Sequence, residues 1–449
     1  MTLTWNDDDV ACSSSEGQPE SSAHSSWSTN SSSAWDDWPP DFDGTGLFES
    51  ITRADEPPIF RFDVRMVLDE VETQVGSAVV DIPRVGKGSN YFGMHLCLEN
   101  GMDVLVRMAR CDVNSPRGLG RHVDEIFEIV QQQVSEVQFE AEIYRLLRPH
   151  RGILTPSLLY WRAPAYEPSA LRSNRSPPRD ILGRAFFVFE KTQGVNNVWP
   201  DNIEKRFSIL KQCARIRAAL FSFPLPVDFV ASWLTQRSPC AKSVSVDIAP
   251  TRDFATAFLA AKIEEVIPDE GDFIGWEEDH NLVGPIALRA KNSLLRLLPY
   301  IMPPPEEHLY RLVLEHGDFG IHNMTITDTD APAVTSLYDW ETGHIVPAIL
   351  SDPQMAVYVD LELDFEGEPA ISRVWEGIGE EERRECGRCA EYYFQTLGEE
   401  APEYLDTFKA GRGARRIWFA LKTWRGDNPE EYFGALGAWA EELLKQVVA

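Results

Sequence analysis

Two short segments of this chain carry residues whose types and spacing suit phosphoryl transfer. The first runs from His316 to Asn323 and places Asp318 five residues before Asn323, and the second begins at Asp339, sixteen positions after Asn323. In a kinase catalytic loop an Asp orients the attacking hydroxyl, and an Asn five residues later holds Mg²⁺ through its amide oxygen. We therefore predict that Asp318 is a catalytic base and that Asn323 and Asp339 bind Mg²⁺.

The segment between Asn323 and Asp339 has the pattern of a β-hairpin. Apolar and β-branched residues at 324–327 and 333–338 flank a turn-forming stretch at 328–332. Because the two strands of a hairpin are antiparallel, the residue entering the first and the residue leaving the second should meet at its open end. Each of these residues alone would more often be an ordinary turn residue, but together with the catalytic Asp they suit a hard cation such as Mg²⁺.

Elements further upstream could position the phosphates of a nucleotide. The chain from Ser77 to Val85 and from Tyr91 to Leu98 is predicted to form two strands, and a third strand at Val104–Ala109 carries Arg107. The guanidinium of this arginine can pair with phosphate oxygens. The connecting loop is expected to approach the phosphates through Gly86, Gly88, Ser89 and Asn90.

A helix predicted from Val123 to Leu147 could hold Arg107 through a glutamate. Its core-facing stripe is formed by Phe139, Ile143, Leu146 and Leu147. Glu140 and Glu142 flank this stripe on opposite sides. Periodicity therefore leaves both residues open as the partner of Arg107.

Over about residues 60 to 440, these motifs resemble the aminoglycoside phosphotransferase and choline kinase-like family, which has the protein-kinase-like fold. The resemblance rests on His316-Gly317-Asp318 with Asn323, on Asp339-Trp340-Glu341, on residues 86–90 and on Arg107. It implies that Asp318 is the catalytic base and that Asn323 and Asp339 bind Mg²⁺. Family members commonly carry Arg where protein kinases carry Lys, so Arg107 fits the group.

The resemblance also implies further nucleotide contacts. Ala141-Glu142-Ile143 matches a helix segment of the family, which favours Glu142 over Glu140 as the partner of Arg107. The apolar strand at 185–189 runs into Glu190 and is similar to the hinge that receives adenine through backbone groups. The chain departs from the family pattern at 221–227 and at 351–353, which lie towards substrate selection, so the resemblance does not name the acceptor.

The expected fold class is α+β, a two-lobed protein-kinase-like fold. We expect residues 1–50 to be a disordered tail rich in Ser, Asp and Trp, residues 51–190 to be an N-lobe with a small antiparallel sheet, and residues 191–449 to be a mostly helical C-lobe with the catalytic loop and metal site. A short acidic-aromatic motif at residues 35–38 leaves a protein contact through the tail as the alternative to a solvated segment.

Composition narrows the classes of partner. The formal net charge of −29 argues against nucleic acid, since Lys and Arg dominate phosphate neutralisation. No apolar run reaches the ~18 residues that span a bilayer, so no membrane insertion is expected, and the first residues lack the order of a signal peptide. The seven scattered cysteines suit a reducing compartment, and we expect a cytoplasmic enzyme.

The predicted function is an ATP- and Mg²⁺-dependent transfer of the γ-phosphate to a hydroxyl of a small molecule. The chain after Asp339 lacks an Ala-Pro-Glu segment of the kind that docks a peptide, which favours a small acceptor. His322 and His344 are expected to be structural, because direct transfer needs no covalent intermediate. Two alternatives stay open: a non-catalytic pseudokinase or regulatory nucleotide-binding module, and an atypical protein kinase.

Overall fold

The computed structural model describes Gly46 and residues 62–110, 123–165, 181–237, 243–268, 280–424 and 428–448. Apart from Gly46, the predicted tail at 1–50 lies outside the described residues, as does its motif at 35–38. The contacts that position the site all belong to the described ranges.

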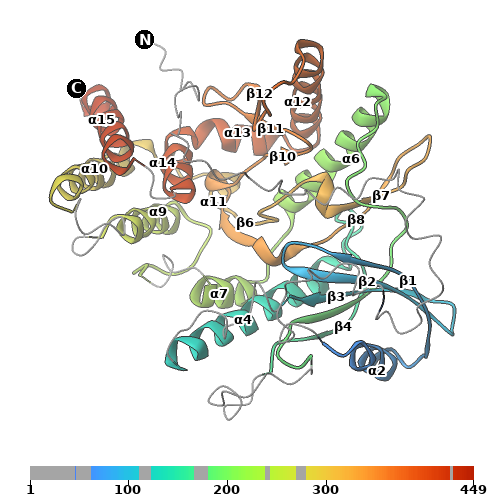
Figure 1. Ribbon diagram of the computed structural model, residues 1–449. Coiled ribbons are helices and arrows are strands. Elements are labelled where there is room, and N and C mark those ends of the chain that lie inside the picture. Colours follow the sequence, from blue (N-terminus) through green and yellow to red (C-terminus); the bar gives the residue numbers. More distant parts are fainter. Residues whose placement is uncertain are drawn as a thin grey trace, which may run out of the picture.

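The first part of the fold is a five-stranded antiparallel sheet with a helix on either face (Figure 1). The strands lie in the order β1-β2-β3-β5-β4. Their bounds are Val79–Lys87 for β1, Tyr91–Leu98 for β2, Asp103–Ala109 for β3, Leu158–Arg162 for β4 and Phe186–Glu190 for β5. The helices are α2 at Val64–Val75 and α4 at Val123–Leu147. The bounds predicted for β2 and α4 are confirmed.

Helix α2 illustrates how local sequence sets an element. Asp63 caps its N-terminus by accepting a hydrogen bond from the backbone N–H of Arg65 at 3.0 Å, and Gly76 ends it in the left-handed conformation at φ 77°. Its buried residues, Val64, Val67, Leu68 and Val71, have the spacing of one helix face. This face packs on the sheet and forms a separate small core with it.

Alternation along β2 and β3 gives the sheet two different faces. The residues that face α2 are the buried Phe92, Met94, Leu96, Leu98, Val104, Val106 and Met108. The opposite face, which we call the Arg107 face, carries Tyr91, Gly93, His95 and Cys97 of β2 and Asp103, Leu105 and Arg107 of β3. On β2 and β3 only the first face is filled with large apolar side chains, so the Arg107 face of these two strands is available for polar contacts. On the neighbouring β5, the same face carries the buried Phe187 and Phe189.

The second part is mostly helical and surrounds three small sheets (Figure 1). Its helices are α6 (Ile203–Ser222), α7 (Val227–Arg237), α9 (Arg252–Val266), α10 (His280–Ile301), α11 (Glu307–Tyr310), α12 (Glu380–Glu400), α13 (Pro402–Ala410), α14 (Arg412–Thr423) and α15 (Pro429–Val448). Its strands are β6 (Leu312–Glu315), β7 (Met324–Ile326), β8 (Val334–Leu337), β9 (His344–Pro347), β10 (Met355–Ala356), β11 (Asp360–Leu363) and β12 (Pro369–Ser372). Short 3₁₀ turns lie at Ile321–Asn323, Trp340–Thr342 and Ala348–Leu350.

This arrangement confirms the predicted α+β fold with a small antiparallel sheet and a mostly helical second part. The larger hydrophobic core joins α4 and one face of β5 to the second part, through residues that include Phe139, Ile143, Tyr144 and Phe189. The predicted boundary after residue 190 falls at the end of β5 and stays a prediction.

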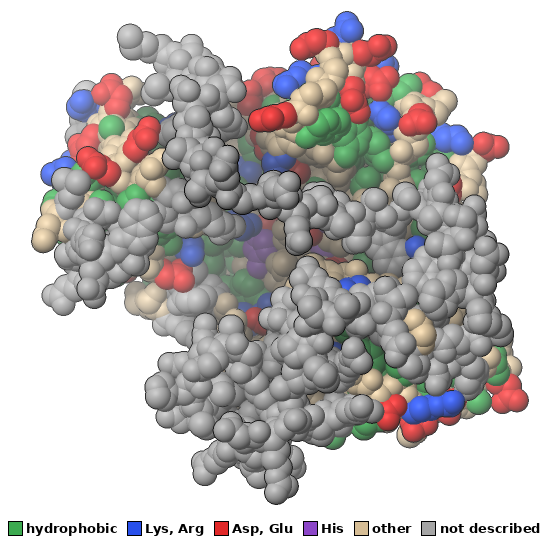
Figure 2. All heavy atoms as spheres, viewed as in Figure 1, with side chains coloured by type: hydrophobic (Ala, Val, Ile, Leu, Met, Phe, Trp, Pro, Cys, Tyr) green, Lys and Arg blue, Asp and Glu red, His purple; other side chains and the backbone are tan. Residues whose placement is uncertain are grey.

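No single helix within the described ranges is both long and apolar enough to cross a membrane. Helices α6 and α7 pass that test only as a pair bent by 95°, and both bury apolar side chains in the core. On the face drawn in Figure 2, acidic and basic side chains are interspersed, and histidine side chains are visible near its centre.

Candidate active site

The predicted hairpin that carries the catalytic motifs is present. Strands β7 and β8 are antiparallel, Met324 lies opposite Leu337, and the N–H of Tyr338 donates to the carbonyl of Asn323 at 3.0 Å. Asn323 therefore enters the hairpin where Asp339 leaves it. The expected convergence of these two residues at the open end is confirmed.

Asp318 lies beside this open end and is held from two directions. Asn323 donates through Nδ2 to the carbonyl and to Oδ2 of Asp318, at 2.9 and 3.0 Å, and Nε2 of His322 lies 3.0 Å from the same Oδ2. The hydrogen bond with His322 lowers the pKa of Asp318 against the opposing effect of burial, and the bond from Asn323 adds a smaller effect in the same direction as His322. Asp318 is thus a partly exposed, ionised carboxylate at neutral pH, able to orient a hydroxyl or accept its proton.

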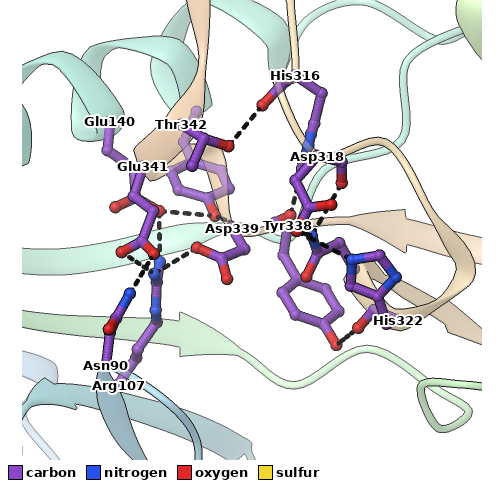
Figure 3. A network of polar contacts seen from close by, with 12 residues as sticks. Asn90, Arg107, Glu140, His316, Asp318, His322, Tyr338, Asp339, Glu341 and Thr342 are labelled. Carbon is purple, nitrogen blue, oxygen red and sulfur yellow. Dashed lines mark hydrogen bonds and ion pairs between the residues drawn. The ribbon is translucent and has the colours of Figure 1, made fainter. Parts of the chain in front are cut away.

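Asp339 owes its direction to an unusual backbone conformation. At φ 67° and ψ 61° it is left-handed, a conformation that Asp tolerates better than most residues. Its N–H donates to the hydroxyl of Tyr144 on α4 at 3.0 Å, and its Oδ1 lies 2.5 Å from an Nη of Arg107. The turn therefore directs the carboxylate towards the sheet (Figure 3).

Arg107 is the centre of a cluster of acidic side chains (Figure 3). Its guanidinium lies 2.5 Å from Glu140, 2.5 Å from Asp339 and 3.2 Å from Glu341, and it stacks 3.8 Å from the centre of the Tyr91 ring. Burial, helped by Asp339 and Glu341, raises the pKa of Glu140 to about 7 against the opposing effect of Arg107. Burial and Asp339 also raise the pKa of Glu341. Three carboxylates around one guanidinium leave excess negative charge, which a further cation would relieve.

The choice of Glu142 as the partner of Arg107 is wrong. Glu142 is exposed, whereas Glu140 is 1% exposed and contacts the guanidinium. Tyr144, one helical turn after Glu140, is also fully buried and donates to Glu140 at 3.3 Å. Tyr144 therefore belongs to the buried stripe of α4 together with Phe139 and Ile143. Its inclusion widens the stripe towards Glu140 and leaves Glu142 on the exposed side of the helix.

The predicted phosphate loop is shorter than expected. Strand β1 continues to Lys87, so Gly86 lies within the strand opposite Gly93 rather than in the loop. The antiparallel pairing between β1 and β2 continues through Gly86 and Lys87. Gly93 in turn lies opposite Arg107, and a side chain added to Gly93 would meet open space. The backbone next to the guanidinium is therefore accessible on the Arg107 face.

The tip of the loop, Gly88, Ser89 and Asn90, is tied down over the acidic cluster. Arg110 donates to the carbonyls of Gly88 and Ser89 at 2.6 and 2.9 Å. Asn90 donates through Nδ2 to Glu341 at 2.8 Å. The loop, the sheet and the β7–β8 hairpin are thus linked through Glu341, which lies two positions after Asp339 and to which the sequence motifs assigned no role.

Glu190 lies apart from this cluster, at the exposed end of β5. Its N–H donates to the carbonyl of Ser157 at 2.9 Å, and the N–H of Lys191 donates to that of Asp103 at 2.9 Å. Both of these backbone N–H groups are therefore already hydrogen-bonded and are not free to donate to an adenine base. A role for Glu190 beside adenine stays a prediction.

The oxygens at the hairpin end fit Mg²⁺. Asn323 bonds to Asp318 through nitrogen, which leaves its amide oxygen to accept, and Asp339 bonds to Arg107 through Oδ1. Carboxylate and amide oxygens are the ligands that this ion takes, with water and phosphate completing its shell. The excess negative charge around Arg107 supports the same assignment.

Asp318 also lines a cavity. The charged side chains in its wall are Arg217, Arg373, Lys422, Glu315 and Asp352. Arg217 is 5% exposed, donates to the carbonyl of Gln354 at 2.6 Å and has no partner for its Nε among the described residues. The cavity therefore offers a polar, mixed-charge surface next to the carboxylate.

His316 and Gly317 hold the catalytic segment in place. His316 is fully buried, packs 4.6 Å from the Trp340 ring and donates from Nε2 to the carbonyl of Tyr338 at 2.8 Å. Gly317 has φ 80°, and a Cβ there would lie 2.2 Å from the carbonyl oxygen of Thr342. Both positions are structural requirements of the turn rather than reacting groups.

Burial lowers the pKa of His316 to about 4, which predicts an acid-sensitive fold. The unfolded chain takes up a proton near pH 6.5, so stability should fall as pH drops from about 6.5 to about 4, by about 3 kcal/mol from this group. In His316→Gln the amide can still donate to Tyr338 but does not titrate. Urea unfolding at pH 7 and pH 4 should show a smaller loss in the variant by about that amount; parallel losses in both proteins would contradict the assignment.

No protein-family model and no curated protein match this chain. Solved structures similar to it include an amicoumacin kinase in complex with AMP-PNP and Ca²⁺, at 13% identity and a TM-score of 0.38, covering 85% of this chain and 94% of that one. A macrolide 2′-phosphotransferase type I is similar at 12% identity and a TM-score of 0.37, covering 84% and 96%. A microcompartment-associated aminopropanol kinase is similar at 13% identity and a TM-score of 0.36, covering 85% and 98%. All three are named as kinases or phosphotransferases, like the family that the motifs resemble. At such low identities and TM-scores, the matches support no assignment by themselves.

Proposed function

We propose that this protein is an ATP- and Mg²⁺-dependent phosphotransferase that transfers the γ-phosphate to a hydroxyl of a small polar molecule. The observation that carries the proposal is the place of Asp318. Its ionised carboxylate accepts a hydrogen bond from Asn323 at the hairpin end that Asp339 leaves, and Asp318 also lines a polar cavity. A phosphoryl donor and a hydroxyl acceptor could thus meet at one carboxylate.

On the donor side, Arg107 would pair with phosphate oxygens, and the accessible backbone at Gly93 would let them approach. Asn323 and Asp339 would hold Mg²⁺, which when bound neutralises phosphate charge. A nucleotide phosphate would otherwise meet three carboxylates around Arg107, so its binding is expected to require a divalent cation. Arg107 would exchange contacts with Asp339 for contacts with phosphate.

On the acceptor side, Asp318 would receive the proton of the attacking hydroxyl. The oxygen of that hydroxyl forms a bond to the γ-phosphorus, and the bond from this phosphorus to the bridging oxygen of ADP breaks. His322 and Asn323 keep Asp318 ionised and oriented throughout. The cations Arg217, Arg373 and Lys422 and the nearby acids favour an acceptor rich in polar groups.

The direct test is transfer of labelled γ-phosphate from ATP into a fractionated cell extract, with and without Mg²⁺, followed by separation of small molecules from protein. We expect label in a small-molecule fraction, and we expect a chelator to abolish both the transfer and tight nucleotide binding. Label on polypeptide would instead favour a protein kinase. Absence of any transfer by folded protein in a broad extract would favour a non-catalytic nucleotide-binding module.

A further inference from the structure

Three side chains with different donor atoms lie together on the Arg107 face of the sheet. His95 and Cys97 are two residues apart on β2, so their side chains share a face, and Cys97 lies opposite Asp103 on β3. Neither the nucleotide contacts nor the acceptor cavity uses any of the three. They occupy the end of this face that is distant from Arg107, since Asp103 precedes Arg107 by four residues, or about 13 Å of strand.

The distances between the donor atoms are close to those within a tetrahedral zinc site. His95 Nε2 lies 3.2 Å from Asp103 Oδ2 and 4.0 Å from Cys97 Sγ, and all the donor atoms lie within 4.8 Å of one another. Usual bond lengths of zinc to nitrogen, oxygen and sulfur place tetrahedral ligands about 3.4 Å (N to O) and about 3.6 Å (N to S) apart. The two distances from the imidazole therefore differ from those of a bound ion by a few tenths of an ångström, and the distance from Cys97 Sγ to the Asp103 carboxylate is at most 4.8 Å.

A simpler interpretation of the cluster is an ion pair between His95 and Asp103. That pair explains two of the side chains but not the cysteine. The thiol is partly exposed and lies within 4.8 Å of the ligand atoms of both partners, whereas Cys213, Cys386 and Cys389 are buried. A thiol, an imidazole and a carboxylate in one place form a ligand set of the kind that zinc takes and magnesium does not.

We infer that His95, Cys97 and Asp103 form a binding site for Zn²⁺ or a similar thiolate-binding transition metal, with the fourth position open to water. The side chains of His95 and Asp103 are 18% and 48% exposed, which gives an ion access from solvent. Burial and Asp103 raise the pKa of the Cys97 thiol to about 11, so binding at neutral pH releases its proton. The need to deprotonate the thiol further favours ions with a high affinity for thiolate over Mg²⁺.

The test uses the full, untagged chain and Co²⁺ as a coloured substitute for Zn²⁺. Titration should produce visible tetrahedral bands and a thiolate-to-cobalt absorption that saturate at about one equivalent. Zn²⁺ should remove both, and Mg²⁺ in excess should remove neither. None of these readouts depends on phosphoryl transfer, so the outcome is independent of the proposed function.

Variants of His95, Cys97 and Asp103 test whether these three side chains bind the metal. Cys97→Ser should lose the thiolate-to-cobalt absorption, and His95→Gln and Asp103→Asn should bind Co²⁺ at least about 10-fold more weakly. Cys12→Ser, which changes a cysteine elsewhere in the chain, should behave like the wild type. The unfolding midpoints of the cluster variants without metal check that the fold is retained. No saturable band in the wild type, or an unchanged band in Cys97→Ser, would overturn the inference.

Discussion

Asp318→Asn is expected to lower the turnover number for phosphoryl transfer by about 10² to 10⁴ and to leave the affinity for nucleotide unchanged. The amide keeps nearly the shape of the carboxylate and can still accept the hydrogen bonds of Asn323 and His322. It cannot accept a proton from the attacking hydroxyl. The loss should therefore appear in turnover rather than in binding.

The matched control for this experiment is Asp328→Asn in the turn of the same hairpin. Asp328 is exposed and lies at the end of the hairpin away from the site, so the variant should retain wild-type turnover. Nucleotide affinity is measured by calorimetry and turnover with the acceptor found in the extract. Comparable turnover in Asp318→Asn and the wild type would remove Asp318 from its proposed role.

Glu140→Ala is expected to destabilise the protein by about 3 kcal/mol, whereas Glu142→Ala should change stability by less than about 0.5 kcal/mol. Arg107 and the hydroxyl of Tyr144 would both lose the buried carboxylate oxygen that accepts their hydrogen bonds. Arg107 would still contact Asp339 and Glu341, so the expected loss is at the low end of the range for such pairs.

The free energy of unfolding of both variants is measured in urea at neutral pH. The two substituted residues lie two positions apart on one helix, so Glu142→Ala is the matched control. Glu140→Ala should also weaken nucleotide binding, because its carboxylate no longer helps to hold the guanidinium that is proposed to contact phosphate. Equal effects of the two substitutions, or a larger effect at Glu142, would contradict the assignment of Glu140 as the partner of Arg107.

The features predicted correctly from sequence are those that short-range rules govern. Three features depend on local patterns of polar and apolar residues. They are the position of Asn323 beside Asp318, the hairpin between Asn323 and Asp339, and the bounds of α4. Pairing between distant parts was harder to predict. The partner of Arg107 depended on how far α4 is rotated against the sheet, and the stripe without Tyr144 left two glutamates equally placed.

The same limit explains the residues that were missed. Nothing local marks Glu341 as a link to Asn90, because the two are joined only when the sheet lies over the catalytic hairpin. The cavity beside Asp318 likewise collects charged residues from segments far apart in the chain, such as Arg217 and Lys422. The predicted end of β1 at Val85 is wrong for a different reason: glycine is typical of loops, but Gly86 lies opposite Gly93 and extends the strand.

Helix α4 packs with the second, mostly helical part of the molecule, because its apolar side chains lie in the larger hydrophobic core and the hydroxyl of Tyr144 accepts a hydrogen bond from the N–H of Asp339. The sheet and α2 share a core of their own. Arg107 reaches from the sheet to Glu140, Asp339 and Glu341 and so fastens one body to the other. Any movement of the sheet away from the hairpin must first loosen this guanidinium. The proposed binding of phosphate by Arg107 and a displacement of the sheet would therefore depend on the same contacts, and a nucleotide that engages Arg107 would alter the freedom of the sheet to move.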